Sequence, residues 1–152
     1  MHPADSLLAT TRRHVFRVTA ADVADFTPEG GHFVHAVCST FRLARAAEWA
    51  GRLFVLELKE EGEEGVGTFV HLDHHAPALV GEEVALEATL DDVTPAGAVT
   101  CSFAARVGER LVASGRTGQR ILPAARLTKI FAAVGATGAT APAAEQASGS
   151  ST

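Results

Sequence analysis

Apolar and polar residues alternate along most of the second half of the chain. This period-two spacing is typical of strands with one buried face, and it predicts strands at residues 66–74, 84–90, 99–107 and 110–122. The segments between them, APALVGEE, TPAG and VGER, carry the glycine and proline of tight turns. A shorter alternation, RRHVFRV at 12–18, predicts one more strand near the N-terminus.

A different pattern fills residues 38–58. This segment has no proline and a single glycine, it is rich in alanine, leucine and arginine, and Ser39 or Thr40 can cap its first turn. At about 100° per residue its apolar positions form one broad face beside a charged stripe, so it predicts the only long helix of the chain. The apolar positions are Leu43, Ala44, Ala46, Ala47, Ala50, Leu53, Phe54 and Val55.

The order of these elements predicts the fold. A strand, a long helix and four more strands make an α+β domain, and we expect the hot-dog fold, in which a mostly antiparallel sheet wraps around one long central helix. This domain is expected to span residues 1–134. Residues 135–152, rich in Ala, Gly, Ser and Thr, bury too little apolar area to offset the entropy of ordering, so they are predicted to form a disordered tail.

Composition and charge narrow the function. The chain has 152 residues, of which 47% are hydrophobic and 20% charged, with a formal net charge of −5. A negative charge argues against binding to nucleic acid or to an anionic membrane, so a small molecule or a protein is the favoured partner. No apolar run approaches the roughly 20 residues of a membrane span, and the N-terminus lacks the apolar core of a secretion signal. We therefore expect a cytoplasmic protein.

The two cysteines, Cys38 and Cys101, show no CxxC or Cys/His ligand spacing. Buried free thiols are the simplest interpretation. Because Cys38 lies near the predicted helix start and close to His35, a nucleophilic thiolate remains the less favoured alternative.

Three histidines and an aspartate crowd into HLDHHAP, residues 71–77. Side chains alternate across a strand, so His74 extends the apolar face of the strand at 66–74, whereas His71 and Asp73 lie on the opposite face. A metal ion needs three or four ligands that converge at about 2.0–2.2 Å. This divergence argues against a metal site.

His74 is the unusual member of the cluster, because it places a titratable ring on the apolar face that the alternation also assigns to Val66 and Thr68. An imidazole at the rim of a core is either a satisfied structural group or a functional one. His71 and His75 are expected to be solvated.

Glu48 lies at the edge of the charged stripe of the predicted helix, beside Val55. Arg45 precedes it by three residues and Arg52 follows it by four, which is the spacing of ordinary surface ion pairs. Spacing alone therefore explains Glu48 as a surface charge, just as it explains Thr40 as a helix cap.

Two segments together resemble the fluoroacetyl-CoA-specific thioesterase family: STFRLARAAEWAGR (39–52) and GVGTFVHLDHHAPALVGEEVALEATL (65–90). The family pattern has a threonine, seven intervening residues and then Glu-Trp-Ala, and here it reads Thr40 and Glu48-Trp49-Ala50. Further on, the family has Gly-Thr, a strand, and a histidine ahead of a glycine; here these are Gly67-Thr68, His74 and Gly81. The resemblance covers roughly residues 12–128.

The resemblance implies that Thr40, Glu48 and His74 are the catalytic set, with Gly67 and Phe33 lining the substrate site. Hydrolysis of a thioester needs an attacking water or carboxylate, a donor to the developing oxyanion and an acid for the leaving thiolate. Glu48 would be the general base or nucleophile, while Thr40 would orient Glu48 or the carbonyl group. His74 would donate to the oxyanion or to sulfur.

The same resemblance implies an acyl-CoA thioesterase that needs neither cofactor nor metal and forms a homodimer with the site at its interface. Gly118-Gln119 stands where the family tends to have His-Glu. We therefore expect a short-chain or specialised acyl-CoA as substrate, a group that includes thioesters like fluoroacetyl-CoA. A non-hydrolytic module that binds acyl thioesters on the same fold is the alternative. An enoyl thioester hydratase is less favoured, because its expected Asp and His motif is not evident.

Overall fold

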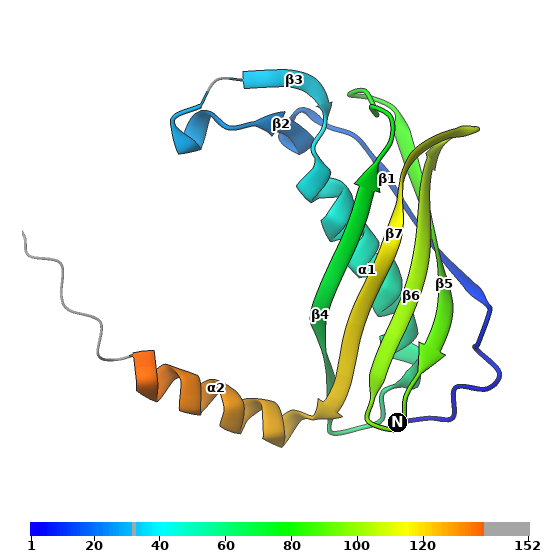
Figure 1. The fold of residues 1–152 in the computed structure, drawn as a ribbon, viewed down its shortest axis with the longest axis vertical. Coiled ribbons are helices and arrows are strands. Elements are labelled where there is room, and N and C mark those ends of the chain that lie inside the picture. Colours follow the sequence, from blue (N-terminus) through cyan, green and yellow to red (C-terminus); the bar gives the residue numbers. More distant parts are fainter. Residues whose placement is uncertain (32, 139–152) are drawn as a thin grey trace, which may run out of the picture.

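The computed structural model describes residues 1–31 and 33–138 (Figure 1). Its centre is a five-stranded sheet in the order β1-β5-β6-β7-β4, and each neighbouring pair runs antiparallel. The strands are β1 (Thr11–Arg17), β4 (Glu63–His74), β5 (Glu83–Val93), β6 (Ala98–Val107) and β7 (Arg110–Pro123). All five strands that the alternation predicts are confirmed, with bounds that differ by a few residues at most.

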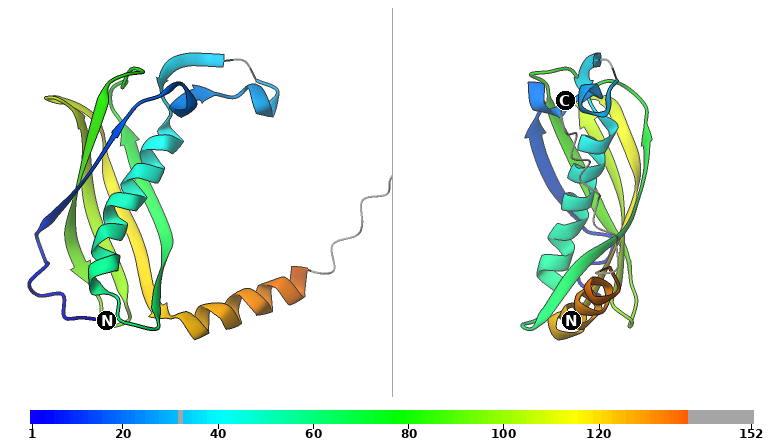
Figure 2. Two further views of the ribbon diagram at one scale, coloured as in Figure 1. Left: turned by 180° about the vertical axis from the view of Figure 1, so that it is seen from behind. Right: turned by 90° about the vertical axis from the view of Figure 1, so that its left-hand side faces the viewer.

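One long helix, α1 (Thr40–Leu58), lies across one face of this sheet (Figures 1 and 2). Its buried positions recur every three or four residues, and Leu43, Phe54 and Leu58 are completely shielded from solvent. Burial of each such side chain contributes about 1.5–3 kcal/mol, so this face holds the helix on the sheet. The α+β architecture of the hot-dog fold is confirmed.

The start of α1 differs slightly from the prediction. Cys38 is the last residue of strand β3 (Phe33–Cys38), so the helix begins at Thr40 rather than at residue 38. Ser39 is the N-cap, and its side chain accepts a hydrogen bond from the backbone N–H of Arg42 at 3.3 Å. Because Ser39 takes the capping role, the hydroxyl of Thr40 is available for a different contact.

Strand β4 contains a β-bulge at Thr68. Gly67 pairs with Gln119 and Phe69 pairs with Gly118, so one residue of β4 has no opposite partner. A bulge of this kind inserts one residue and reverses the alternation of the side chains that follow.

The bulge decides which residues of β4 face α1. Before it, Gly67 faces the helix, because a Cβ added there would collide with Glu48. After it, Leu72 packs against the core and His74 contacts the first residue of α1. The predicted alternation, which placed Val66 and Thr68 on the face of His74, is therefore wrong across the bulge. Gly67 and His74 face the same helix although seven positions separate them.

Two further elements project from the domain on the side of the β4 edge (Figures 1 and 2). At one end, β2 (Val23–Asp25) and β3 pair as a small antiparallel ribbon, with short 3₁₀ turns at Ala20–Asp22 and Thr27–Glu29. At the other end, helix α2 (Ala124–Gly138) follows β7. The sequence predicted neither the ribbon nor this second helix.

Helix α2 extends past the predicted domain boundary at residue 134. Residues 135–138, which were assigned to the disordered tail, form the end of α2. The rest of the predicted tail, residues 139–152, lies outside the described residues. Neither α1 nor α2, as far as the structure describes them, is long and apolar enough to cross a membrane.

Candidate active site

Thr40 and His74 meet where the first turn of α1 passes the end of β4. The Oγ1 atom of Thr40 lies 3.0 Å from Nδ1 of His74, and both side chains are exposed at the surface of the protomer. The two residues are 34 positions apart in the chain, so their contact depends on the packing of α1 against β4.

The backbone fixes the tautomer of His74. Its second ring nitrogen, Nε2, lies 3.1 Å from the carbonyl oxygen of Ala76. A carbonyl oxygen only accepts hydrogen bonds, so Nε2 carries a hydrogen and donates to Ala76. In the neutral ring Nδ1 is then an acceptor, and it receives the hydroxyl hydrogen of Thr40. Both ring nitrogens are thus engaged, which holds the imidazole in one orientation.

Glu48 lies against Gly67 of β4, about two turns along α1 from Thr40. A Cβ at Gly67 would overlap Oε1 of Glu48 and approach its Cδ to 3.2 Å. Only glycine leaves room for the carboxylate to lie this close to the strand. Gly67 therefore forms the floor beneath Glu48.

The predicted residues form two pairs within one protomer. Eight residues of helix correspond to a rise of about 12 Å, which separates Glu48 from Thr40 along α1. The structure brings Thr40 to His74 and Glu48 to Gly67, and in the described part of the chain no hydrogen bond joins one pair to the other.

Arg45 and Arg52 flank Glu48 on α1 without forming an ion pair with it in the described part of the chain. Arg52 donates to the carbonyl oxygen of Gly65 at 2.9 Å and pairs with Glu64 at 3.0 Å. Over the described residues, neither Arg45 nor Arg52 forms an ion pair with Glu48 within 4.0 Å. Glu48 is exposed, but the ion pairs that its spacing suggested are not formed among the described residues, so its carboxylate is open to a ligand.

Two clefts meet at Glu48. The larger has a volume of about 580 Å³ and is lined by Arg42, Arg45 and Arg52 together with Trp49. The smaller has a volume of about 270 Å³, and Gly67, Thr68, Phe69 and Val70 line it together with Glu48. Glu48 thus borders both clefts: the larger carries three arginines and Asp22, and the smaller has a mostly polar lining.

The two neighbouring histidines, His71 and His75, make their contacts away from His74. His71 is exposed and its ring lies against Phe69, with ring centroids 4.8 Å apart. His75 is also exposed, and its Nε2 lies 2.8 Å from Oγ of Ser114. The expectation that both are solvated is confirmed. Residues 1–31 and 33–138 contain no group of three or more His, Cys, Asp or Glu side chains that could hold a metal ion.

The thiols are buried and protonated. Cys38 and Cys101 are both free and buried, as predicted. Burial raises the pKa of Cys38 to about 11, and burial likewise raises the pKa of Cys101 to about 12. A thiol of this kind is a poor nucleophile near neutral pH, so the alternative of a nucleophilic Cys38 is not supported.

Gln119, which the sequence indicated only as a departure from the family pattern, is a neighbour of the site. It is 3% exposed, and its Nε2 donates to the backbone carbonyl oxygen of Glu48 at 3.0 Å. Its inward position on β7, between the buried residues Thr117 and Ile121, was a signal that could have indicated its role. Phe33, the predicted lid residue, begins strand β3 in the projecting ribbon, but its side chain lies outside the described structure, so its role stays a prediction.

Comparison with known proteins places the chain in a family. The chain matches the fluoroacetyl-CoA-specific thioesterase family over residues 18–125. No curated protein matches it in sequence. Among solved structures, a hypothetical protein of Thermus thermophilus, a thioesterase superfamily member, is 30% identical with a TM-score of 0.85, and the match covers 93% of this chain and 100% of that one.

Two more distant structures share the fold. The fluoroacetyl-CoA thioesterase FlK is 23% identical with a TM-score of 0.75, covering 89% of this chain and 97% of its own. A hot-dog-like protein from Thermanaerovibrio acidaminovorans is 21% identical with a TM-score of 0.76, covering 88% and 97%. The chain therefore belongs to the fluoroacetyl-CoA-specific thioesterase family, a group of hot-dog enzymes that hydrolyse acyl-CoA thioesters.

Proposed function

We propose that this enzyme hydrolyses short-chain acyl-CoA thioesters with Thr40, Glu48 and His74 as its catalytic residues. The observation that carries this assignment is the hydrogen bond between Thr40 and His74, with His74 held in turn by the carbonyl group of Ala76. A hydroxyl positioned by an oriented imidazole is the arrangement that acyl transfer uses to handle charge on oxygen and sulfur.

The reaction begins at Glu48. As a general base, the carboxylate removes a proton from a water molecule whose oxygen attacks the thioester carbon, and the electron pair of the C=O bond moves onto oxygen. As a nucleophile, it attacks the same carbon directly, and water then hydrolyses the resulting anhydride. Both routes use a carboxylate that is not held in an ion pair, and Glu48 forms none with residues 1–31 or 33–138.

Thr40 and His74 act on the charges that develop. When His74 is protonated, Nδ1–H donates to Oγ1 of Thr40, and the hydroxyl hydrogen is free to donate to the oxyanion. When the intermediate collapses, the C–S bond breaks, and the Thr40 hydroxyl passes its proton to the CoA thiolate while it takes the Nδ1 proton of His74 in exchange. The proton that Glu48 removed from water then returns to His74 through solvent, which restores both groups. In a single turnover Glu48 therefore accepts a proton and His74 gives one up.

The two clefts fit the two ends of the substrate. By its size, a space of about 270 Å³ between Glu48 and residues 67–70 suits a short acyl group rather than a long chain. On the other side of Glu48, Arg42, Arg45 and Arg52 line a space of about 580 Å³. Arg42 and Arg52 pair with Asp22 and Glu64, whereas Arg45 forms no ion pair among the described residues. Guanidinium groups bind phosphate oxygens strongly, so Arg45 is the residue of this cleft best suited to the phosphates of CoA.

A homodimer with the site at its interface is part of the proposal. Two aromatic side chains of α1 near the site, Phe41 and Trp49, are 62% and 45% exposed in one protomer. Strand β4 forms an edge of the sheet, and an edge strand is a natural surface for pairing.

We also propose a cytoplasmic location. The free thiols at Cys38 and Cys101 are compatible with the reducing conditions of the cytoplasm.

The test is the release of CoA thiol from a panel of acyl-CoA thioesters of increasing chain length. Wild-type protein is expected to turn over the shortest substrates best, and His74→Ala is expected to lose this activity. His75→Ala changes the exposed neighbouring histidine and serves as the matched control that keeps it. Tight acyl-CoA binding without thiol release from any substrate would contradict hydrolysis and favour a binding module.

A further inference from the structure

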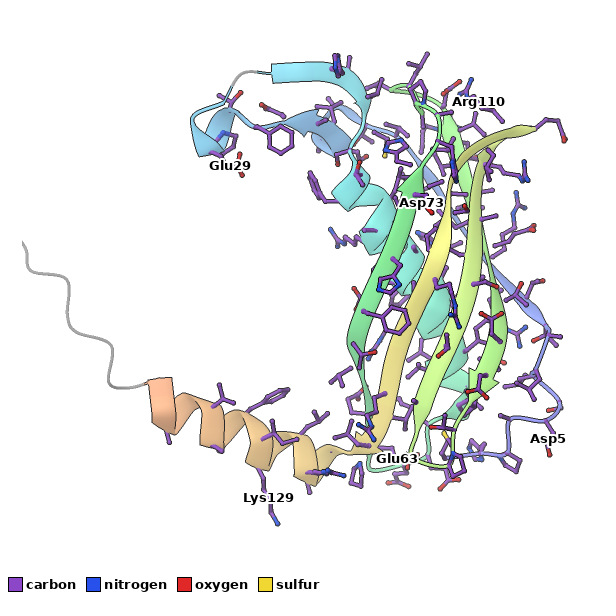
Figure 3. The ribbon with its side chains drawn as sticks, viewed as in Figure 1. Asp5, Glu29, Glu63, Asp73, Arg110 and Lys129 are labelled. Carbon is purple, nitrogen blue, oxygen red and sulfur yellow. The ribbon has the colours of Figure 1, made fainter. Side chains whose placement is uncertain are left out.

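Helix α2 carries an apolar face that its own domain leaves uncovered. Leu127, near the start of the helix, is only 8% exposed, whereas Ile130 and Phe131 are 43% and 62% exposed. These three residues lie on one side of the helix at the i, i+3, i+4 spacing. Lys129 lies on the opposite side and points away from the β2–β3 ribbon (Figure 3). The apolar face of α2 is therefore turned toward the open space beside β4.

Two projecting elements, helix α2 and the β2–β3 ribbon, bound that open space at the two ends of the edge strand β4. We call these two elements the arms. The backbone N–H of Ala124, the first residue of α2, donates to the carbonyl oxygen of Gly62 at 2.8 Å, which ties α2 to the start of β4. The β2–β3 ribbon and the Thr40–His74 pair lie at the other end of β4 (Figures 1 and 3). Between them, β4 pairs with β7 on one side only.

A second copy of this chain fits this shape by two-fold symmetry. Antiparallel pairing of two β4 edges places the Glu63 end of one strand beside the Asp73 end of the other (Figure 3). Glu63 and Glu64 are already paired in their own protomer, with the N-terminal amine and with Arg52 and Lys59, so their charges do not oppose this approach to Asp73.

The same symmetry exchanges the arms. Because α2 is attached at the Glu63 end of β4, antiparallel pairing carries it to the Thr40 end of the partner subunit. That end presents exposed apolar side chains of its own: Phe26 is 50% exposed and Phe41 is 62% exposed. The uncovered apolar face of each arm therefore meets an uncovered apolar face of the other copy, as an isologous interface requires.

We propose that Ile130 and Phe131 of α2 form a wall of the acyl site of the partner subunit, over its Thr40 and His74. This inference rests on the proposed function. Thr40 and His74 are both exposed in a single protomer, where bulk water screens every charge that forms during the reaction. An apolar wall excludes that water, and hydrogen bonds to the oxyanion and the sulfur are stronger in the dry site.

Mixed dimers test whether the wall acts across the interface. His74→Ala and Phe131→Asp protomers with different affinity tags are co-expressed, and the dimer carrying both tags is isolated. Homodimers of His74→Ala are expected to be inactive, and homodimers of Phe131→Asp to lose at least about tenfold in kcat/KM. In the mixed dimer, the intact His74 receives an intact α2 from its partner, so about half of the wild-type kcat/KM per dimer should return.

The alternatives give different results. If Phe131 served its own protomer, the only intact His74 would lie beside the Phe131→Asp substitution, and the mixed dimer would be no more active than the Phe131→Asp homodimer. An active monomer in light scattering would also overturn the inference while leaving the thioesterase function intact. Lys129→Ala, on the opposite side of α2, is the matched control and should leave kcat/KM unchanged. Inactive wild-type protein would instead contradict the proposed function.

Discussion

The hydroxyl of Thr40 and Nδ1 of His74 lie 3.0 Å apart, with the far side of the imidazole engaged by the carbonyl group of Ala76. The contact joins the start of a helix to the end of an edge strand. A backbone acceptor fixes the ring, so the protonation of Nδ1 decides whether Thr40 donates to His74 or to the substrate.

The first prediction concerns the hydroxyl of Thr40. Thr40→Val keeps the shape of the side chain but removes the donor, and we expect kcat to fall about 10²-fold. Thr40→Ser keeps the hydroxyl and should stay within about tenfold of wild type. Thiol-release kinetics measure both variants.

Thermal unfolding separates this effect from damage to the helix. Because Ser39 caps α1, both Thr40 variants are expected to unfold within about 4 °C of wild type. Equal kcat for the Val and Ser variants would contradict the assigned role of the hydroxyl.

The second prediction concerns Gly67. In Gly67→Ala the added methyl group would overlap Oε1 of Glu48, so the carboxylate must move, and we expect kcat to fall about 10²-fold. Gly65→Ala is the control: its methyl group would collide with Val55 instead, which affects stability rather than Glu48. A double-mutant cycle of Gly67→Ala with Glu48→Gln should be strongly non-additive. Additive losses would show that Gly67 does not act through Glu48.

The third prediction concerns the thiols. Burial raises the pKa of Cys38 to about 11, so at pH 8 nearly all of this group is protonated. Iodoacetamide at pH 8 is expected to leave activity intact, and Cys38→Ala should keep kcat within about twofold, since side chains outside the reacting set contribute little to it. A raised folded-state pKa gives stability that is complete below the unfolded value and is lost as pH rises through about 11. Rapid inactivation by iodoacetamide at pH 8 would count against this assignment.

The fourth prediction concerns Asp22, which links the segment before α1 to Arg42 in the first turn of the helix. Its carboxylate accepts from Thr19 at 2.7 Å and from Nε of Arg42 at 2.7 Å. Although partial burial opposes it, these hydrogen bonds lower the pKa of Asp22. Hydrogen bonds to a charged group contribute about 2 kcal/mol, so Asp22→Asn should lower the free energy of unfolding at pH 7 by about that amount.

The pH dependence gives the sign of this effect. A lowered folded-state pKa gives stability that is present above the unfolded pKa and is lost as pH falls through the folded value. The difference between wild type and Asp22→Asn should therefore shrink steadily below about pH 4. Urea unfolding at pH 7 and at pH 3 measures it, and a difference that stays constant would contradict the assignment.

Much of the fold follows from local pattern. The alternating strands and the Ala-rich helix are confirmed because burial of one face leaves a periodic record in the sequence. The bulge at Thr68 has no such periodic signal in the sequence, since one inserted residue only switches which faces of the sheet the following side chains occupy. This explains why the face of His74 was predicted correctly while Val66 and Thr68 were assigned wrongly.

Other features depend on contacts that no local pattern carries. Helix α2 does show apolar spacing at Leu127, Ile130 and Phe131, but its own domain buries only the first of them. The carbonyl group of Ala76 orients His74, and every residue has such a carbonyl group, so the sequence could not single it out. Spacing alone explained Thr40 as a helix cap, but in the structure Ser39 takes that role. Spacing also explained Glu48 as a surface charge, and it gave no sign that the carboxylate lies against Gly67 of β4.

The central claim is that an unpaired carboxylate at Glu48 drives thioester hydrolysis. The most direct measurement is kcat for CoA release from the best short acyl-CoA by Glu48→Gln, which keeps the shape and removes the charge. Glu61→Gln, on the exposed turn after α1, is the matched control. We predict that Glu48→Gln loses at least about 10³-fold in kcat while the control matches wild type. Turnover by Glu48→Gln within about tenfold of wild type would contradict this account of the site.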